Sequence, residues 1–207
     1  MTIQLYKVIV TIICLSFPLL AIAIPAAVVD TVQAKAAFQR EGRQQPLAQG
    51  IELYAGDIIT TGAKARVVIR LADRSLIRIG AHAHVKFEQL NSPVSNSEIL
   101  TAVFNVLKGV FRFTGSHNNP LDVKIRVGNS ISAGIRGTDV YTDSQADKDL
   151  VCLISGKVSV QAGKVKTMLT QPREGFIVPK NGTPLPISQI SEEKFQQWLK
   201  NSEINVQ

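Results

Sequence analysis

The chain has 207 residues, of which 45% are hydrophobic and 6% aromatic, and its formal net charge is +7. That length allows one domain with a sizeable core, or one domain and a tail. Lysine and arginine are dispersed, and no zinc-finger spacing, RNP-like motif or recognition helix accompanies them, which speaks against nucleic-acid binding. A basic chain of this kind remains suited to anionic surfaces and acidic polymers.

Residues 1–23 have the composition of a signal peptide. Lys7 ends a short basic region, residues 8–23 carry no charge, and Ala21-Ile22-Ala23 is a small-residue cleavage site. We therefore expect export to the periplasm and no stable transmembrane span after cleavage. An uncleaved N-terminal anchor is the alternative, although the apolar run is short for a spanning helix, which needs about 20 residues.

Cleavage after residue 23 would remove Cys14 and leave Cys152 as the only cysteine, so no internal disulfide is expected. Cys152 lies in the apolar run LVCLISG, which predicts a core position. A catalytic cysteine would instead need a neighbouring base and an exposed, electropositive setting.

From residue 24 to about 184 the chain alternates short β-type segments with glycine, asparagine, aspartate and proline. Residues 66–80 predict a hairpin that turns at Asp73-Arg74. Residues 121–127 alternate strictly, with Lys124 and Arg126 on the face opposite to the apolar side chains.

Three segments resemble one another as strand, glycine, strand: LIRIGAHAHV, VLKGVFRF and LISGKVSV. The last is interpreted as a hairpin that turns at Ser155-Gly156. Their irregular spacing argues against a fixed repeat. They predict a chain that winds through short strands, as an all-β, short-stranded β-sandwich or an irregular β-helix would.

Residues 185–207 are predicted to be a linker and an amphipathic C-terminal helix. Ser191 is placed as the N-cap, and Phe195, Trp198 and Leu199 fall on one face together with the preceding Ile190. We expect this face to pack on the β domain, since a short helix is rarely stable without a surface to cover. Docking to a partner is the alternative.

Four segments carry a family resemblance when they are read in order. They are YAGDIITTGAKARVVIRLADRSLIRIG (54–80), LKGVFRFTG (107–115), AGIRGTDVYT (133–142) and LVCLISGKVSV (150–160). With these motifs the chain resembles the FecR domain family, the ferric-citrate-regulator type of periplasmic β domain, over residues 26 to 180. One departure is Arg74, which stands where the family has a glycine.

The resemblance implies a non-catalytic domain without cofactor or metal, and structural roles for the motif residues. The inner-membrane helix and the sigma-factor-binding segment of the regulators have no counterpart here, so we expect a stand-alone secreted member. The motif residues are Gly56, Asp57, Gly62, Asp73, Gly109, Arg136, Gly137, Thr138 and Gly156.

Arg136, between two glycines, raises a choice between architecture and chemistry. Its planar fork of five donors could satisfy carbonyl groups left unpaired at a strand crossing, and we interpret it as such a latch. Contact with an acidic ligand is the alternative.

His82 and His84, two residues apart, would share one face of a strand and form half of a metal site, with His117 and Glu88 as further candidates. A polar surface loop is the default interpretation. The run TDSQADKD (142–149) is interpreted as a solvated loop rather than a calcium site. No catalytic motif is present, so we expect no enzyme.

The sequence therefore predicts a protein-binding adaptor or sensing module in the cell envelope, with an unknown envelope protein as partner. Binding of an anionic polysaccharide or peptidoglycan is the alternative, motivated by the positive charge. A secreted metalloenzyme with His82 and His84 is the third hypothesis.

Overall fold

A computed structural model describes residues 25–91, 100–116 and 121–204 of the chain. The predicted signal segment, Cys14 and His117 lie outside these ranges. The described part holds seventeen strands and one helix, so the predicted all-β fold with a C-terminal helix is confirmed. None of its helices is long and apolar enough to cross a membrane.

The strands form two layers that share one long strand, β9 (Leu100–Thr114), which pairs with strands of the second layer over its first part and of the first layer over its last part. The first layer also contains β1 (Ala27–Gln33), β4 (Glu52–Leu53), β6 (Arg66–Leu71), β7 (Leu76–Ile79), β12 (Asp139–Ser144), β13 (Lys148–Ser155), β16 (Glu174–Pro179) and β17 (Ser188–Gln189). The second contains β2 (Ala36–Arg40), β3 (Arg43–Pro46), β5 (Ile58–Thr61), β8 (His84–Asn91), β10 (Leu121–Val127), β11 (Ile131–Ile135), β14 (Val158–Ala162) and β15 (Val165–Leu169).

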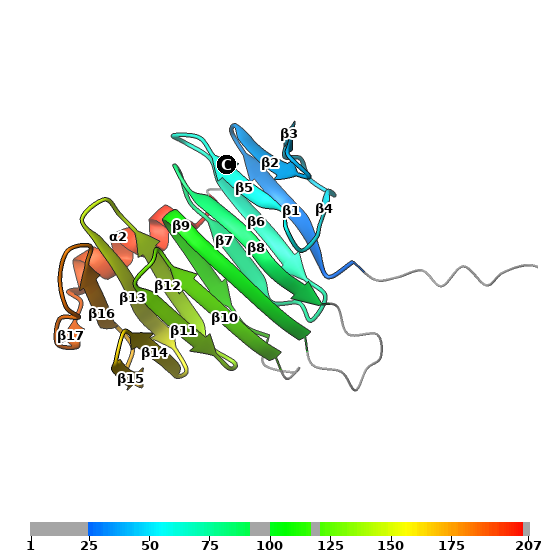
Figure 1. Cartoon of the computed structure of the whole chain (residues 1–207). Helices are drawn as coiled ribbons and strands as arrows, with labels where there is room; N and C mark the ends of the chain where they lie inside the picture. Colours follow the sequence, from blue (N-terminus) through cyan, green and yellow to red (C-terminus); the bar gives the residue numbers. More distant parts are fainter. Residues whose placement is uncertain (1–24, 92–99, 117–120, 205–207) are drawn as a thin grey trace, which may run out of the picture.

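Within each layer the strands lie side by side nearly in chain order (Figure 1). The first layer runs β1, β6, β7, β9, β12, β13, β16, β17. The second runs β3, β2, β5, β8, β9, β10, β11, β14, β15. Every pair is antiparallel except β9 with β10. The fold thus has features of both predicted alternatives. It has the two packed layers of a β-sandwich, and its chain winds between the layers as in an irregular β-helix. The layers do not close into a barrel.

The three strand–glycine–strand segments mark places where the chain passes between the layers. One joins β7 to β8, one is β9 itself, and one joins β13 to β14. The predicted hairpin at Ser155-Gly156 is therefore wrong. β13 pairs with β12 and β16, whereas β14 pairs with β11 and β15 in the other layer.

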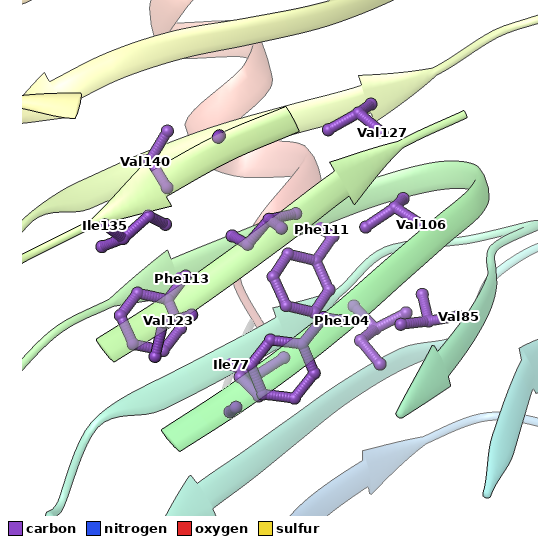
Figure 2. Close-up of a cluster of buried hydrophobic side chains, with 14 of the residues drawn as sticks. Ile77, Val85, Phe104, Val106, Phe111, Phe113, Val123, Val127, Ile135 and Val140 are labelled. Atoms are coloured by element: carbon purple, nitrogen blue, oxygen red, sulfur yellow. The ribbon is translucent and has the colours of Figure 1, made fainter. Parts of the chain in front are cut away.

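The core lies between the layers and is made by the inward residue of each alternating strand. Phe104 and Phe111, from the two parts of β9, meet there (Figure 2), with ring centroids 5.5 Å apart. Phe87 packs edge-on against Phe104 with ring centroids 5.0 Å apart. Aromatic pairs of this kind add to the free energy of burial. The core therefore holds the two layers together where β9 crosses.

The helix α2 (Glu192–Ser202) covers part of the outer side of the first layer, at its β12 and β13 end (Figure 1). Its Phe195 and Trp198 are buried and form a second cluster with Tyr141, Leu150 and Cys152 of β12 and β13. Ser191 is the N-cap as predicted, although its side chain makes no capping hydrogen bond. The apolar face of the helix thus packs on the β domain.

Candidate functional site

The predicted motif residues Gly56 and Asp57 lie in the turn between β4 and β5. The Asp57 carboxylate is fully buried and accepts two hydrogen bonds from Arg40, at 2.8 Å from Nε and 2.7 Å from Nη2. It also accepts one from the Tyr54 amide at 2.8 Å, while the Gly56 amide donates to the Phe87 carbonyl. This paired carboxylate stabilises the turn, because it is buried and cannot contact a substrate.

Asp73 closes the turn between β6 and β7. Its carboxylate accepts hydrogen bonds from the Ser75 amide at 3.0 Å and the Ser75 hydroxyl at 2.5 Å. The intervening Arg74 has φ +72°, the left-handed conformation that glycine adopts without strain. Arg74 therefore takes a turn conformation that a glycine would adopt at lower cost.

Gly109 lies where β9 passes from one layer to the other. Its φ is +81°, and a Cβ here would lie 2.7 Å from the Cα of Ala83. Gly62 is another close approach, since its amide donates to the Lys35 carbonyl at 2.9 Å. Both glycines position backbone rather than a ligand.

The segment around Arg136 crosses between the layers, and Thr138 fastens that crossing. The buried Thr138 hydroxyl lies 2.7 Å from the carbonyl oxygen of Lys157, to which it donates, and Gly156 passes so close that a Cβ on it would lie 3.0 Å from the Gly137 carbonyl oxygen. The Arg136 side chain is exposed and makes no hydrogen bond or ion pair with any described residue. This geometry contradicts the latch interpretation of Arg136 and leaves its guanidinium available to a ligand.

The two histidines do not form the strand pair that a metal site would use. His82 is exposed in a turn with φ +53°, and only His84 lies in β8. Within residues 25–91, 100–116 and 121–204, no three His, Cys, Asp or Glu side chains gather as metal ligands would. The described residues thus offer no support to the metalloenzyme hypothesis.

Cys152 is fully buried, and burial raises the pKa of its thiol to about 12. A nucleophilic cysteine needs the opposite shift and access to solvent. Its predicted place in the core is therefore correct.

The predicted solvated loop at 142–149 is wrong in part. Asp143 and Asp149 are buried, and the Asp149 carboxylate accepts a hydrogen bond from Lys180 Nζ at 2.6 Å. The sequence shows an almost continuous run of polar residues here, but it does not show that Lys180 lies beside them. This ion pair ties β13 to the segment after β16.

The outer side of the second layer is the broad surface that no helix covers in the described structure (Figure 1). Strand alternation sends Lys124 and Arg126 of β10 to this side, as the sequence predicted, together with Lys166 of β15. Arg136 and Lys157 are exposed where β11 ends and β14 begins. We call Lys124, Arg126, Arg136, Lys157 and Lys166 the basic face.

One polar row crosses the basic face from strand to strand. Asn105 of β9 pairs with Arg126, Arg126 with Ser132 of β11, and Ser132 with Gln161 of β14. A hollow of about 440 Å³ lies over this row. Arg126 forms an ion pair with Glu88, and the buried Oδ1 of Asn105 has no hydrogen-bond partner among the described residues.

The basic face has open space above β11. Gly134 lies there, and a Cβ on it would meet nothing within 4 Å. Aromatic platforms, on which neutral sugars stack, are missing from the described part of this face, and Trp198 is buried under α2. The surface can therefore attract an acidic partner by charge.

The comparisons with known proteins give a family and a fold. A model of the family described as FecR protein matches residues 57–166. No curated protein matches the chain. Two crystal structures of a "putative anti-sigma factor" from Parabacteroides distasonis ATCC 8503 resemble it, with TM-scores of 0.55 and 0.54 at 17% and 18% identity. The match covers 69% of this chain and 63% and 64% of those two chains, so this protein spans less than two thirds of their length.

Proposed function

This chain belongs to the FecR protein family, and on that premise we propose that it is a non-catalytic regulatory module that binds an acidic protein partner in the cell envelope. The basic face is the contact surface in this proposal. The observation that carries it is the contrast between the two outer sides of the domain. One is partly covered by α2, over β12 and β13, whereas the other has no described helix on it and carries the basic face.

Three further observations support a binding role. The carboxylates of the motif residues Asp57 and Asp73 accept hydrogen bonds from neighbouring residues of the same chain. The thiol of Cys152 is buried. Both structural neighbours carry the name "putative anti-sigma factor", which favours a regulatory role. Export by residues 1–23 would place this module in the periplasm.

The competing candidate is a binder of anionic envelope polymer, which the basic face also favours. The two differ in their response to salt, because attraction between a polymer and dispersed surface charges is screened beyond about 8 Å at physiological ionic strength. A protein interface with buried apolar contacts keeps more of its affinity when salt is raised.

The test is a crosslinking capture from intact envelope at physiological salt. The wild type is compared with Lys124→Glu/Lys157→Glu on the basic face and with Lys64→Glu/Lys200→Glu, which changes the net charge equally at exposed positions elsewhere. We expect one discrete protein to be captured by the wild type and the control pair but not by the basic-face pair. Equal capture by all three would overturn the proposal, and salt-sensitive recovery of glycan without protein would support the polymer binder.

A further inference from the structure

The last strand of the second layer, β15, has an open edge. In the described residues it pairs only with β14, from Val158–Leu169 at one end to Ala162–Val165 at the other. The two strands are joined by the two residues Gly163 and Lys164, and Gly163 has φ +56°. An unpaired strand edge presents a row of backbone donors and acceptors to a partner chain.

The hairpin geometry identifies which backbone groups face outward. In a hairpin with a two-residue loop the residues that flank the loop form a hydrogen-bonded pair, and bonded and non-bonded pairs then alternate. Val165, Thr167 and Leu169 therefore bond to β14. The N–H and C=O groups of Lys166 and Met168 point away from β14. Neither N–H donates a hydrogen bond to any described residue.

The other sheet edges are protected. The edge strand β3 is four residues long and ends in Pro46. β1 has a register shift between Val29 and Thr31, and the Val29 amide donates to Ile51. The edge of β16 is covered by β17 and by a hydrogen bond from Leu185 to Ile177. Proteins commonly shield edges by such devices, and β15 has no proline, register shift or covering strand among the described residues.

Exposed apolar side chains gather around this edge. Six large apolar side chains are exposed in the described residues, and four of them are Val165 and Met168 on β15 and Leu185 and Ile187 near β16. A groove of about 380 Å³ separates Val165 from Thr183 and Pro184. Apolar surface beside an open edge is typical of a binding site.

The two sides of β15 differ in chemistry. Val165 and Thr167 pair with the inward residues Ala162 and Val160, so an added strand would direct alternate side chains beside them into the groove. Lys166 and Met168 pair with the outward residues Gln161 and Ser159, so the other side chains of that strand would lie on the basic face. Because side chains alternate along a strand, an added strand would contact both the groove and the basic face.

We propose that β15 is a docking edge for an extended segment of a partner protein in which acidic residues alternate with apolar ones. The acidic side chains pair with Lys166 and the apolar ones enter the groove beside Val165. A second copy of this chain is a poorer occupant, because pairing two β15 strands would bring two basic faces side by side. This inference rests on the proposed function and names how the partner is held.

The experiment measures amide hydrogen exchange by NMR on the protein with and without a seven-residue peptide of alternating glutamate and valine. We expect exchange at Lys166 and Met168 to slow by about tenfold or more when the peptide is bound, and Thr167, already bonded to β14, to change little. A peptide in which lysine replaces glutamate is the matched control and should leave both amides unprotected.

Two variants separate docking from misfolding. Met168→Pro removes an outward N–H without removing a bond to β14, and should abolish protection. Lys166→Glu keeps every backbone group and should reverse which peptide binds. The lysine–valine peptide should then protect the edge, and the glutamate–valine peptide should not.

Lack of protection at both amides with millimolar glutamate–valine peptide would overturn the inference. So would equal protection by the two peptides, or protection that appears without peptide as the protein concentration rises, which would indicate self-pairing. Protection by the peptide without capture of any envelope protein would support β15 as a docking edge and contradict the proposed function. Capture of an envelope protein without protection by the peptide would support the proposed function and contradict docking at β15.

Discussion

Trp198 of α2 stacks on Tyr141 of β12, with ring centroids 5.2 Å apart and ring planes 3° apart. Both side chains are buried, and burial raises the pKa of Tyr141. The helix is thus fixed on the first layer by its apolar face and is unavailable as a docking helix. The basic face lies on the other side of the domain, which no helix covers in the described residues.

Replacement of Trp198 by alanine should destabilise the protein by about 3 kcal/mol, because a large buried aromatic side chain and its stacking contact with Tyr141 are lost. Urea unfolding followed by circular dichroism measures this loss. Gln197→Ala, at an exposed position of the same helix, is the control and should change the free energy of unfolding by less than about 0.5 kcal/mol. Equal stability of Trp198→Ala and wild type would mean that the helix does not pack as described.

Gly109→Ala should destabilise by about 2 kcal/mol or more. The added Cβ costs about 1–2 kcal/mol for the left-handed backbone, and it meets Ala83 in a packed core. Gly134→Ala is the matched control on β11, where the space is open, and should be neutral or slightly stabilising. Thermal unfolding of the two variants distinguishes them, and a similar small effect at both positions would contradict the crossing geometry.

Arg74→Gly should stabilise the protein by about 0.5–1 kcal/mol. Arginine at φ +72° is strained, and relief of this strain exceeds the extra freedom that glycine gives to the unfolded chain. Gln39→Gly, at an exposed position in β2, should be destabilising by a similar amount because glycine weakens a strand. Chemical denaturation of both variants gives the comparison, and a loss of stability in Arg74→Gly would refute it.

Asp143 should make stability depend on pH. Burial raises the pKa of its carboxyl above the ordinary 3.8, although a hydrogen bond from Gln145 at 2.6 Å acts the other way. A raised pKa in the folded state means that the neutral acid is favoured there. Its contribution is therefore fully present below the unfolded pKa and is lost as pH rises through the folded pKa.

Asp143→Asn keeps the acceptor for Gln145 and removes the buried charge, so it should stabilise the protein at pH 7 by on the order of 1 kcal/mol. The difference from wild type should shrink as pH falls toward 4, which urea unfolding at several pH values measures. Asp147→Asn, at an exposed neighbour, is the control for the substitution itself and should change the free energy of unfolding at pH 7 by less than about 0.5 kcal/mol. A difference that is independent of pH would exclude Asp143 as its source.

Local patterns predicted a large part of the fold. The alternation in residues 121–127 placed Lys124 and Arg126 correctly, and the turn at Asp73 joined β6 to β7 as expected. The helix and its apolar face also follow from spacing alone. These features depend on residues close in the chain, which is why the sequence carries them.

Features that depend on distant residues were missed. A glycine between two strands looks the same in a hairpin and in a crossing between layers, so Ser155-Gly156 was misinterpreted. The burial of Asp149 depends on Lys180, thirty-one residues away. Arg136 offered the donors of a latch, but the carbonyl group of Lys157 is bound by Thr138 instead. The open edge of β15 likewise follows only from the order of strands in the layer.

The central claim, that the basic face binds a protein partner, is tested most directly by a photoreactive amino acid placed at residue 134. Gly134 lies at the centre of this face with open space above it, and Arg70, exposed on the first layer, is the matched control position. After illumination of intact cells, the account predicts one discrete protein adduct from position 134 and none from position 70. Absence of an adduct at 134, or the same adducts from both positions, would contradict it.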